Sequence, residues 1–126
     1  MTGELYQIKV GVKSPLVQSH IFLTAALDMC AGCNLVRANQ VPEGSIIRDL
    51  KRPPVISSAQ GQAVDVIGVV TLMTQLRGVG VSVQMEFIVV EDLVAPAVLG
   101  TPWIDQNVLF ISPQRGTVLG QLREGM

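Results

Sequence analysis

The chain has 126 residues, of which 48% are hydrophobic and 15% charged, so its length and composition predict a single globular domain over residues 1–126. Nine lysine and arginine residues against ten acidic ones, without charge runs, argue against nucleic acid or a membrane surface as a partner. The N-terminus lacks signal-peptide features, no apolar run reaches the ~18 residues of a membrane span, and two cysteines suit a reducing compartment. We therefore expect a cytoplasmic or otherwise intracellular protein.

Val and Ile together exceed a fifth of the sequence, which favours an all-β fold because β-branched residues suit pleated surfaces. The first predicted strand runs from Tyr6 to Val12, where apolar side chains alternate with polar residues or glycine. The apolar run Ile21–Leu27 predicts a second strand, buried on both faces, that ends at Asp28. Prolines and glycines then predict a turn-rich connection over residues 32–54.

The second half of the chain carries further strand signals. Two apolar runs flanking a polar tip predict one long hairpin over Val55–Leu76. Strict alternation over Val81–Val89 is the clearest strand pattern in the sequence. Thr101 is expected to cap a short helix, with Pro102 at its first position. A strand over Val108–Ile111 and a final apolar pair before a polar tail complete the pattern.

Residues able to carry chemistry gather directly after the second predicted strand. Cys30 and Cys33 form a Cys-x-x-Cys pair, which supports disulfide exchange when its first thiol lies at a helix N-terminus. A redox domain of that kind needs strands alternating with long helices, and this sequence has one short helix signal. A zinc site needs four ligands, and His20 is the one other strong candidate. Two half-buried thiols near a turn, without redox or metal chemistry, are the simpler interpretation.

Asp28 supports a different interpretation, because a carboxylate at the end of a buried strand needs either hydrogen bonds or a functional surface. A structural role is the alternative, since aspartate side chains also cap turns. The segment Leu27–Val36 resembles the active-site segment of the retroviral-type aspartic proteases (retropepsins), in which Asp-Thr-Gly-Ala follows an apolar strand. The segment Ala97–Ile104 is similar to the apolar-apolar-Gly segment that enters the family's short C-terminal helix, and residues 58–61 lie where the family carries its flap.

This resemblance covers roughly residues 5–120 and implies an all-β closed barrel with a flap hairpin and one short C-terminal helix. It implies an aspartic endopeptidase of peptides or polyproteins, in which two carboxylates share a proton and activate a water. The chain has one such segment, so the resemblance implies a homodimer joined through terminal strands, with one catalytic Asp28 from each subunit. No metal or cofactor is implied. The implied substrate-binding residues, in the active-site loop and the flap, are Ala31, Gly32, Ser58, Ala59, Gln60 and Gly61.

Met29 and Cys30 occupy the positions where the family carries Thr and Gly. The family's Thr hydroxyl ties the two active-site loops together across the dimer, whereas the Met29 thioether donates no hydrogen bond. Cys30 adds a side chain where Gly leaves room for close backbone approach. Three interpretations follow: an aspartic protease impaired by these residues, an inactive dimerisation or peptide-binding module with the same fold, and an active parent sequence altered by engineering or drift.

Overall fold

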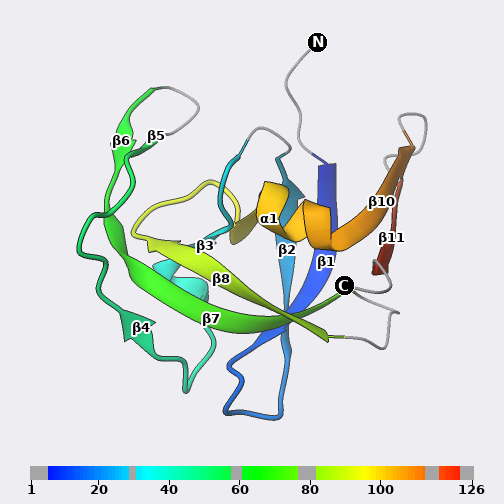
Figure 1. The fold of residues 1–126 in the computed structure, drawn as a ribbon, viewed down its shortest axis with the longest axis horizontal. Coiled ribbons are helices and arrows are strands. Elements are labelled where there is room, and N and C mark those ends of the chain that lie inside the picture. The colour runs from blue at the N-terminus through cyan, green and yellow to red at the C-terminus, as the bar shows by residue number, and fades with distance from the viewer. Residues whose placement is uncertain (1–5, 29–30, 58–60, 77–81, 113–116, 123–126) are drawn as a thin grey trace.

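The computed structural model describes residues 6–28, 31–57, 61–76, 82–112 and 117–122 (Figure 1). Its barrel strands are β1 (Tyr6–Lys13), β2 (Ile21–Leu27), β3 (Leu35–Arg37), β7 (Val66–Leu76), β8 (Ser82–Val90) and β9 (Ala97–Leu99). Their order is β1-β2-β9-β3-β8-β7, and β7 also pairs with β1. The six strands therefore form a closed barrel, which confirms the predicted fold class. A seventh strand, β4 (Ile47–Arg48), pairs with β7 beside the ring.

The long antiparallel pairs of the barrel follow the alternation of the sequence. β1 pairs with β2 along its length, and β7 pairs with β8 in the same way. Ile8, Val10 and Val12 are buried, whereas Gln7 and Lys9 are exposed. The predicted inward face of the first strand is therefore confirmed, whereas Gly11 on the predicted outward face is buried.

The short strands of the barrel lie where the sequence predicts only a connection. β9 lies between β2 and β3, parallel to the first and antiparallel to the second, and β3 runs parallel to β8. The predicted turn-rich connection over residues 32–54 is therefore wrong where β3, a 3-10 helix (Ala38–Gln40) and β4 lie. β3 is too short to show a period, and Leu35 and Val36 are buried because other strands flank them on both sides.

The prediction that β2 is buried on both faces holds for its second half alone. Ile21 is 41% exposed and Phe22 is 57% exposed, whereas Leu23 and Ala25–Leu27 are buried. β9 pairs only with Ala25–Leu27, so within the described chain the first half of β2 has a strand neighbour on one side. The buried half is the one that leads to Asp28.

Residues 55–76 form two separate elements and not one long hairpin. β5 (Ile56–Ser57) and β6 (Ala63–Val64) pair antiparallel in a small sheet of their own, whereas β7 pairs with β8. Figure 1 shows this β5–β6 hairpin, hereafter the flap, projecting beyond the end of the barrel. Its tip, residues 58–60, lies outside the described residues.

The predicted short helix is confirmed as α1 (Thr101–Gln106), with its start shifted by one residue. The carbonyl of Gly100 accepts hydrogen bonds from the N–H groups of Trp103 at 3.1 Å and Ile104 at 3.0 Å. Gly100 therefore holds the cap position that we predicted for Thr101. β10 (Asn107–Ser112) and β11 (Thr117–Leu122) follow as a hairpin that forms its own two-stranded sheet. Within the described ranges, no helix has the length and apolar character needed to cross a membrane.

The interior of the barrel holds the larger of two apolar clusters, and α1 is attached to it through Trp103. The Trp103 side chain is 1% exposed, and its Nε1 donates a hydrogen bond to Thr74 Oγ1 at 3.1 Å. Thr74 Oγ1 in turn donates to the Val83 carbonyl at 2.9 Å. These bonds fix the helix against β7 and β8.

Candidate active site

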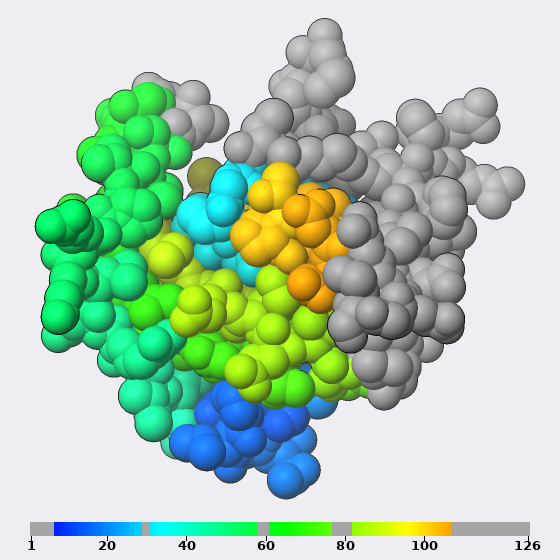
Figure 2. Space-filling view, viewed as in Figure 1, coloured from blue at the N-terminus to red at the C-terminus, as the bar shows by residue number. Residues whose placement is uncertain are grey.

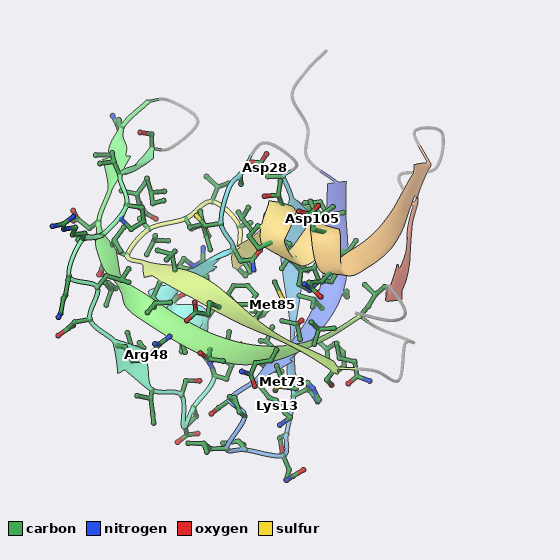
Figure 3. All side chains as sticks on the ribbon, viewed as in Figure 1. Lys13, Asp28, Arg48, Met73, Met85 and Asp105 are labelled. Carbon is green, nitrogen blue, oxygen red and sulfur yellow. The ribbon has the colours of Figure 1, made fainter. Side chains whose placement is uncertain are left out.

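Asp28 lies directly after β2, at the end of the barrel from which the flap projects (Figure 3). Its backbone N–H donates to the Leu99 carbonyl at 3.0 Å, and its own carbonyl accepts from the Ala31 N–H at 3.1 Å. The first bond continues the parallel pairing of β2 with β9, and the second ties Asp28 to Ala31. Asp28 is therefore half-buried and held by its backbone at the point where β2 and β9 both end.

The two segments that suggested a family resemblance lie against each other at this point. The Thr101 N–H donates to the Ala31 carbonyl at 2.9 Å, so the start of α1 is bonded to the loop after Asp28. A Cβ at Gly100 would lie 2.6 Å from the Ala31 carbonyl oxygen and closer still to that of Cys33. Real Cβ atoms do not approach that closely, so this crossing of two backbones requires glycine.

The second apolar cluster lies between this crossing and the flap. Its buried members are Ala26, Leu35, Val90 and Val98, from β2, β3, β8 and β9, and the flap adds the half-buried Ile56 and Val64. Figure 2 shows the surface hollowed between the flap and the segments around α1. The hollow therefore has a carboxylate-bearing loop on one side and an apolar hairpin on the other.

The predicted site residues divide between the loop and the flap. Ala31 is half-buried, and Gly32 is exposed with no atom within 4 Å of the position that a Cβ would take. Gly61 is exposed in the flap and has a φ of 81°, a conformation that favours glycine. The remaining predicted residues lie outside the described residues; they are Met29, Cys30, Ser58, Ala59 and Gln60.

The thiol of Cys33 belongs to the same loop. It is half-buried in the second apolar cluster, and this burial raises the pKa of the thiol. A raised pKa lowers the thiolate fraction at neutral pH, which is the opposite of what a reactive thiol needs. The ring of His20, the other candidate zinc ligand, lies beside Gly11, which is a residue of β1. In the described part of the chain, no three His, Cys, Asp or Glu side chains are grouped so that they could hold a metal ion.

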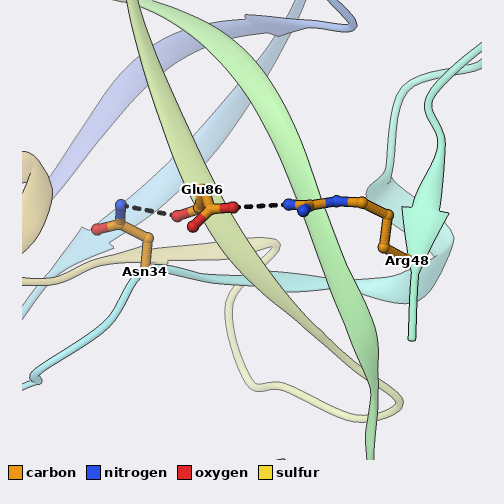
Figure 4. A network of polar contacts seen from close by, with 3 residues as sticks. All are labelled: Asn34, Arg48 and Glu86. Carbon is orange, nitrogen blue, oxygen red and sulfur yellow. Dashed lines mark hydrogen bonds and ion pairs between the residues drawn. The ribbon is translucent and has the colours of Figure 1, made fainter. Parts of the chain in front are cut away.

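Sequence reasoning missed Asn34, which lies between the loop and β3. Its side chain is 1% exposed and hydrogen bonds to Gly100 and to Glu86. Figure 4 shows the bond to Glu86. The available signal is an amide side chain directly before the apolar pair Leu35-Val36, because a polar side chain next to a buried strand needs hydrogen-bond partners.

We compared the sequence with protein families and curated proteins, and the structure with solved structures. No family model matches the sequence, and no curated protein is significantly similar to it. The structure is similar to EIAV protease in complex with the inhibitor HBY-793, with a TM-score of 0.59 at 14% identity, over 82% of this chain and 88% of that one. It is also similar to the retroviral protease-like domain of Ddi1 from Leishmania major, with a TM-score of 0.57 at 12% identity, over 95% of this chain and 98% of that one. The chain has a retropepsin-like fold. At these identities the likeness shows the fold alone.

Proposed function

We propose that this chain is an aspartic endopeptidase of the retropepsin type, whose site is completed by Asp28 of a second copy. The observation that carries the proposal is the position of Asp28, half-buried where β2 and β9 end and facing the side on which the flap projects. In the retropepsin family, which the sequence resembles, the aspartate at this position carries out hydrolysis.

The chemistry follows from two carboxyl groups placed together. Carboxylates a few ångströms apart do not both ionise, so an Asp28 pair would share one proton. The ionised member takes a proton from a water, whose oxygen attacks the peptide carbonyl carbon, while the protonated member donates to the carbonyl oxygen. Breakage of the C–N bond then releases an amine, which takes up a proton, and a carboxylic acid. No metal or cofactor takes part in these steps.

The flap and the second apolar cluster support an extended peptide or polyprotein segment as the substrate. A peptide in the hollow would lie against β5 and β6, whose backbone groups can pair with an extended chain. The surrounding side chains are apolar, as in Ile56, Val64 and Val98. The substrate is therefore expected to be held by backbone hydrogen bonds and by burial of its own apolar side chains.

The C-terminal hairpin supports pairing with a second copy through terminal strands. In the part of the chain that the structure describes, β10 and β11 pair only with each other, and their outer edges meet no other strand. A two-stranded hairpin is marginally stable in water by itself, and exposed edges readily pair with further strands. Pairing of two such hairpins would stabilise both and bring the two copies of Asp28 together.

Met29 and Cys30 support the second candidate function, an inactive dimerisation or peptide-binding module with the same fold. The Met29 thioether has no donor for the hydrogen bonds that a Thr hydroxyl makes. This candidate keeps the flap, the hollow and the dimer but lacks hydrolysis.

A cleavage assay on a peptide library, at mildly acid and neutral pH, tests the proposal. The chain is compared with Asp28→Asn, with the double variant Met29→Thr plus Cys30→Gly, and with Asp105→Asn, which changes an exposed aspartate on α1 as a matched control. We expect cleavage that Asp28→Asn abolishes and Asp105→Asn leaves unchanged. Cleavage by the double variant alone would identify an inactive relative of a protease.

The oligomeric state is measured on the same samples by sedimentation. If folded, dimeric samples of the chain and of the double variant cut no peptide, the protease proposal is wrong. A chain that stays a folded monomer at high concentration would also contradict it, because one copy supplies one Asp28.

A further inference from the structure

The amide side chain of Asn34 is nearly fully buried and bonded at both ends. Its Oδ1 accepts a hydrogen bond from the Gly100 N–H at 3.0 Å, and its Nδ2 donates to the Glu86 carbonyl at 3.2 Å (Figure 4). Its backbone carbonyl accepts from the Ile88 N–H at 2.8 Å. One residue thus joins the loop after Asp28 to β8 and to the segment that enters α1.

The bond from Gly100 lies between the two bonds that hold the Asp28 loop. Leu99, one residue before Gly100, accepts from the Asp28 N–H, and Thr101, one residue after it, donates to the Ala31 carbonyl. We propose that Asn34 is a positioning residue, which sets where the Asp28 carboxylate lies by holding Gly100 against this loop. The role as a positioning residue rests on the proposed proteolytic function, whereas the physical constraint on the loop does not.

The burial of this side chain makes the constraint strict. An amide that is 1% exposed cannot rotate away from Gly100 without leaving a buried donor or acceptor unpaired. An apolar side chain of similar size would fill the space but would remove the acceptor for the Gly100 N–H. Since misplacement of a reacting group by about 1 Å lowers a rate about 100-fold, loss of this bond should affect the chemical step more than peptide binding.

Thr74 provides a matched control. It is also 1% exposed and makes two hydrogen bonds, one from Trp103 and one to Val83, but it lies on β7 and neither partner belongs to the Asp28 loop. Asn34→Ala and Thr74→Val each remove one buried and one partly buried hydrogen bond, so both variants are expected to lose stability. Only Asn34→Ala is expected to change the position of the loop that carries Asp28.

The experiment measures the kcat and KM of peptide cleavage and the hydrogen exchange of the Asp28 and Thr101 amides. It uses the chain as it is, or the Met29→Thr plus Cys30→Gly variant if only that variant cleaves. For Asn34→Ala we expect kcat to fall about 10- to 100-fold with KM nearly unchanged, and both amides to exchange at least about tenfold faster relative to global unfolding. For Thr74→Val we expect kcat and the exchange of these two amides, relative to global unfolding, to stay near their original values.

Asn34→Asp tests by pH whether the bond to Glu86 is needed to hold the side chain at position 34 against Gly100, and it serves if Asn34→Ala does not fold. The protonated carboxyl can accept from Gly100 and donate to the Glu86 carbonyl, whereas the ionised form has lost the donor. We therefore expect kcat of this variant to recover as the pH falls, relative to the parent. The parent carries the same neighbouring ionisable groups, which are Asp28, Cys33 and Glu86 with its partner Arg48, so the ratio isolates position 34.

The possible results separate the two proposals. Equal falls in kcat for Asn34→Ala and Thr74→Val, at equal loss of stability, would show that Asn34 is structural only. If no version of the chain cleaves, the protease proposal fails. In that case, exchange of the Asp28 and Thr101 amides in Asn34→Ala that is unchanged relative to global unfolding would overturn the constraint itself, and faster relative exchange would support it.

Discussion

Replacing Gly100 with alanine tests whether the crossing of two backbones holds the candidate site together. The new Cβ would lie 2.6 Å from the Ala31 carbonyl oxygen and 3.0 Å from the Cys33 carbonyl carbon, with the Cys33 oxygen nearer still. All three are backbone atoms, and the Ala31 oxygen already accepts from Thr101. Relief of the clash therefore needs the loop after Asp28 and the start of α1 to move apart.

The size of the effect follows from this lack of freedom. Overpacking of a protein interior costs about 1–3 kcal/mol, and the upper end applies because no flexible side chain can give way. An unfolding entropy of about 2.1 cal/mol/K per residue gives about 0.26 kcal/mol/K for 126 residues, so 3 kcal/mol lowers the Tm by about 11 °C. The single tryptophan, Trp103, is buried, so its fluorescence reports unfolding directly.

Gly32→Ala is the control, four residues after Asp28 in the same loop. Nothing lies within 4 Å of its Cβ position, so alanine there is expected to be neutral or to stabilise by about 0.4–1 kcal/mol through the unfolded state. A Gly100→Ala protein whose Tm lies within about 2 °C of the Gly32→Ala protein would show that the two segments do not pack this closely.

Three further predictions concern other contacts. Thr74→Val removes the hydrogen bonds to Trp103 and Val83 and is expected to lower the free energy of unfolding by about 1–3 kcal/mol, measured in urea; a Thr74→Ser protein of equal instability would contradict this. Arg48 and Glu86 form an ion pair at 2.6 Å, but their side chains are 53% and 65% exposed, so Arg48→Ala should cost less than about 1 kcal/mol, and a larger loss would refute this estimate. Because burial raises the pKa of the Cys33 thiol, stability should fall as the pH rises above the ordinary thiol range, where the unfolded chain loses its proton first. In a Cys30→Ser background, Cys33 should also react with iodoacetamide more slowly when folded than in urea, and equal rates would contradict its burial.

The parts of the fold that the sequence could predict are those whose stability is local or periodic. β1 and β8 alternate over many residues, so their inward faces can be read directly. Pro102 indicates the short helix. The cap is Gly100 and not Thr101, because the first N–H groups of the helix bond to the backbone carbonyl of Gly100, which no side chain in the sequence indicates. Asp28 was selected by its place at the end of an apolar run, and the structure puts it beside the second motif.

The parts that could not be predicted depend on partners far away in the sequence. β3 and β9 have three residues each, which is too few for any period, and they form because they pair with each other and each pairs with one long strand, β8 or β2. Asn34 and Gly100 are 66 positions apart, and nothing in either residue type indicates that the two are hydrogen-bonded. The sequence predicts a flap at residues 58–61 within one hairpin over Val55–Leu76, and its separation from β7 follows from the pairing of β7 with β8.

The same long-range pairing decides how the candidate site responds to instability. The Asp28 N–H bonds to Leu99, and Leu27 pairs with Leu99, so the loop is held only when β9 has entered the barrel between β2 and β3. Contacts between distant segments form late, because closing a long loop costs entropy before they are made. Exchange of the Asp28 amide in the unchanged chain should therefore follow the global free energy of unfolding. Exchange at a much lower free energy would show that β9 leaves the barrel by itself, and the site would then open without unfolding of the protein.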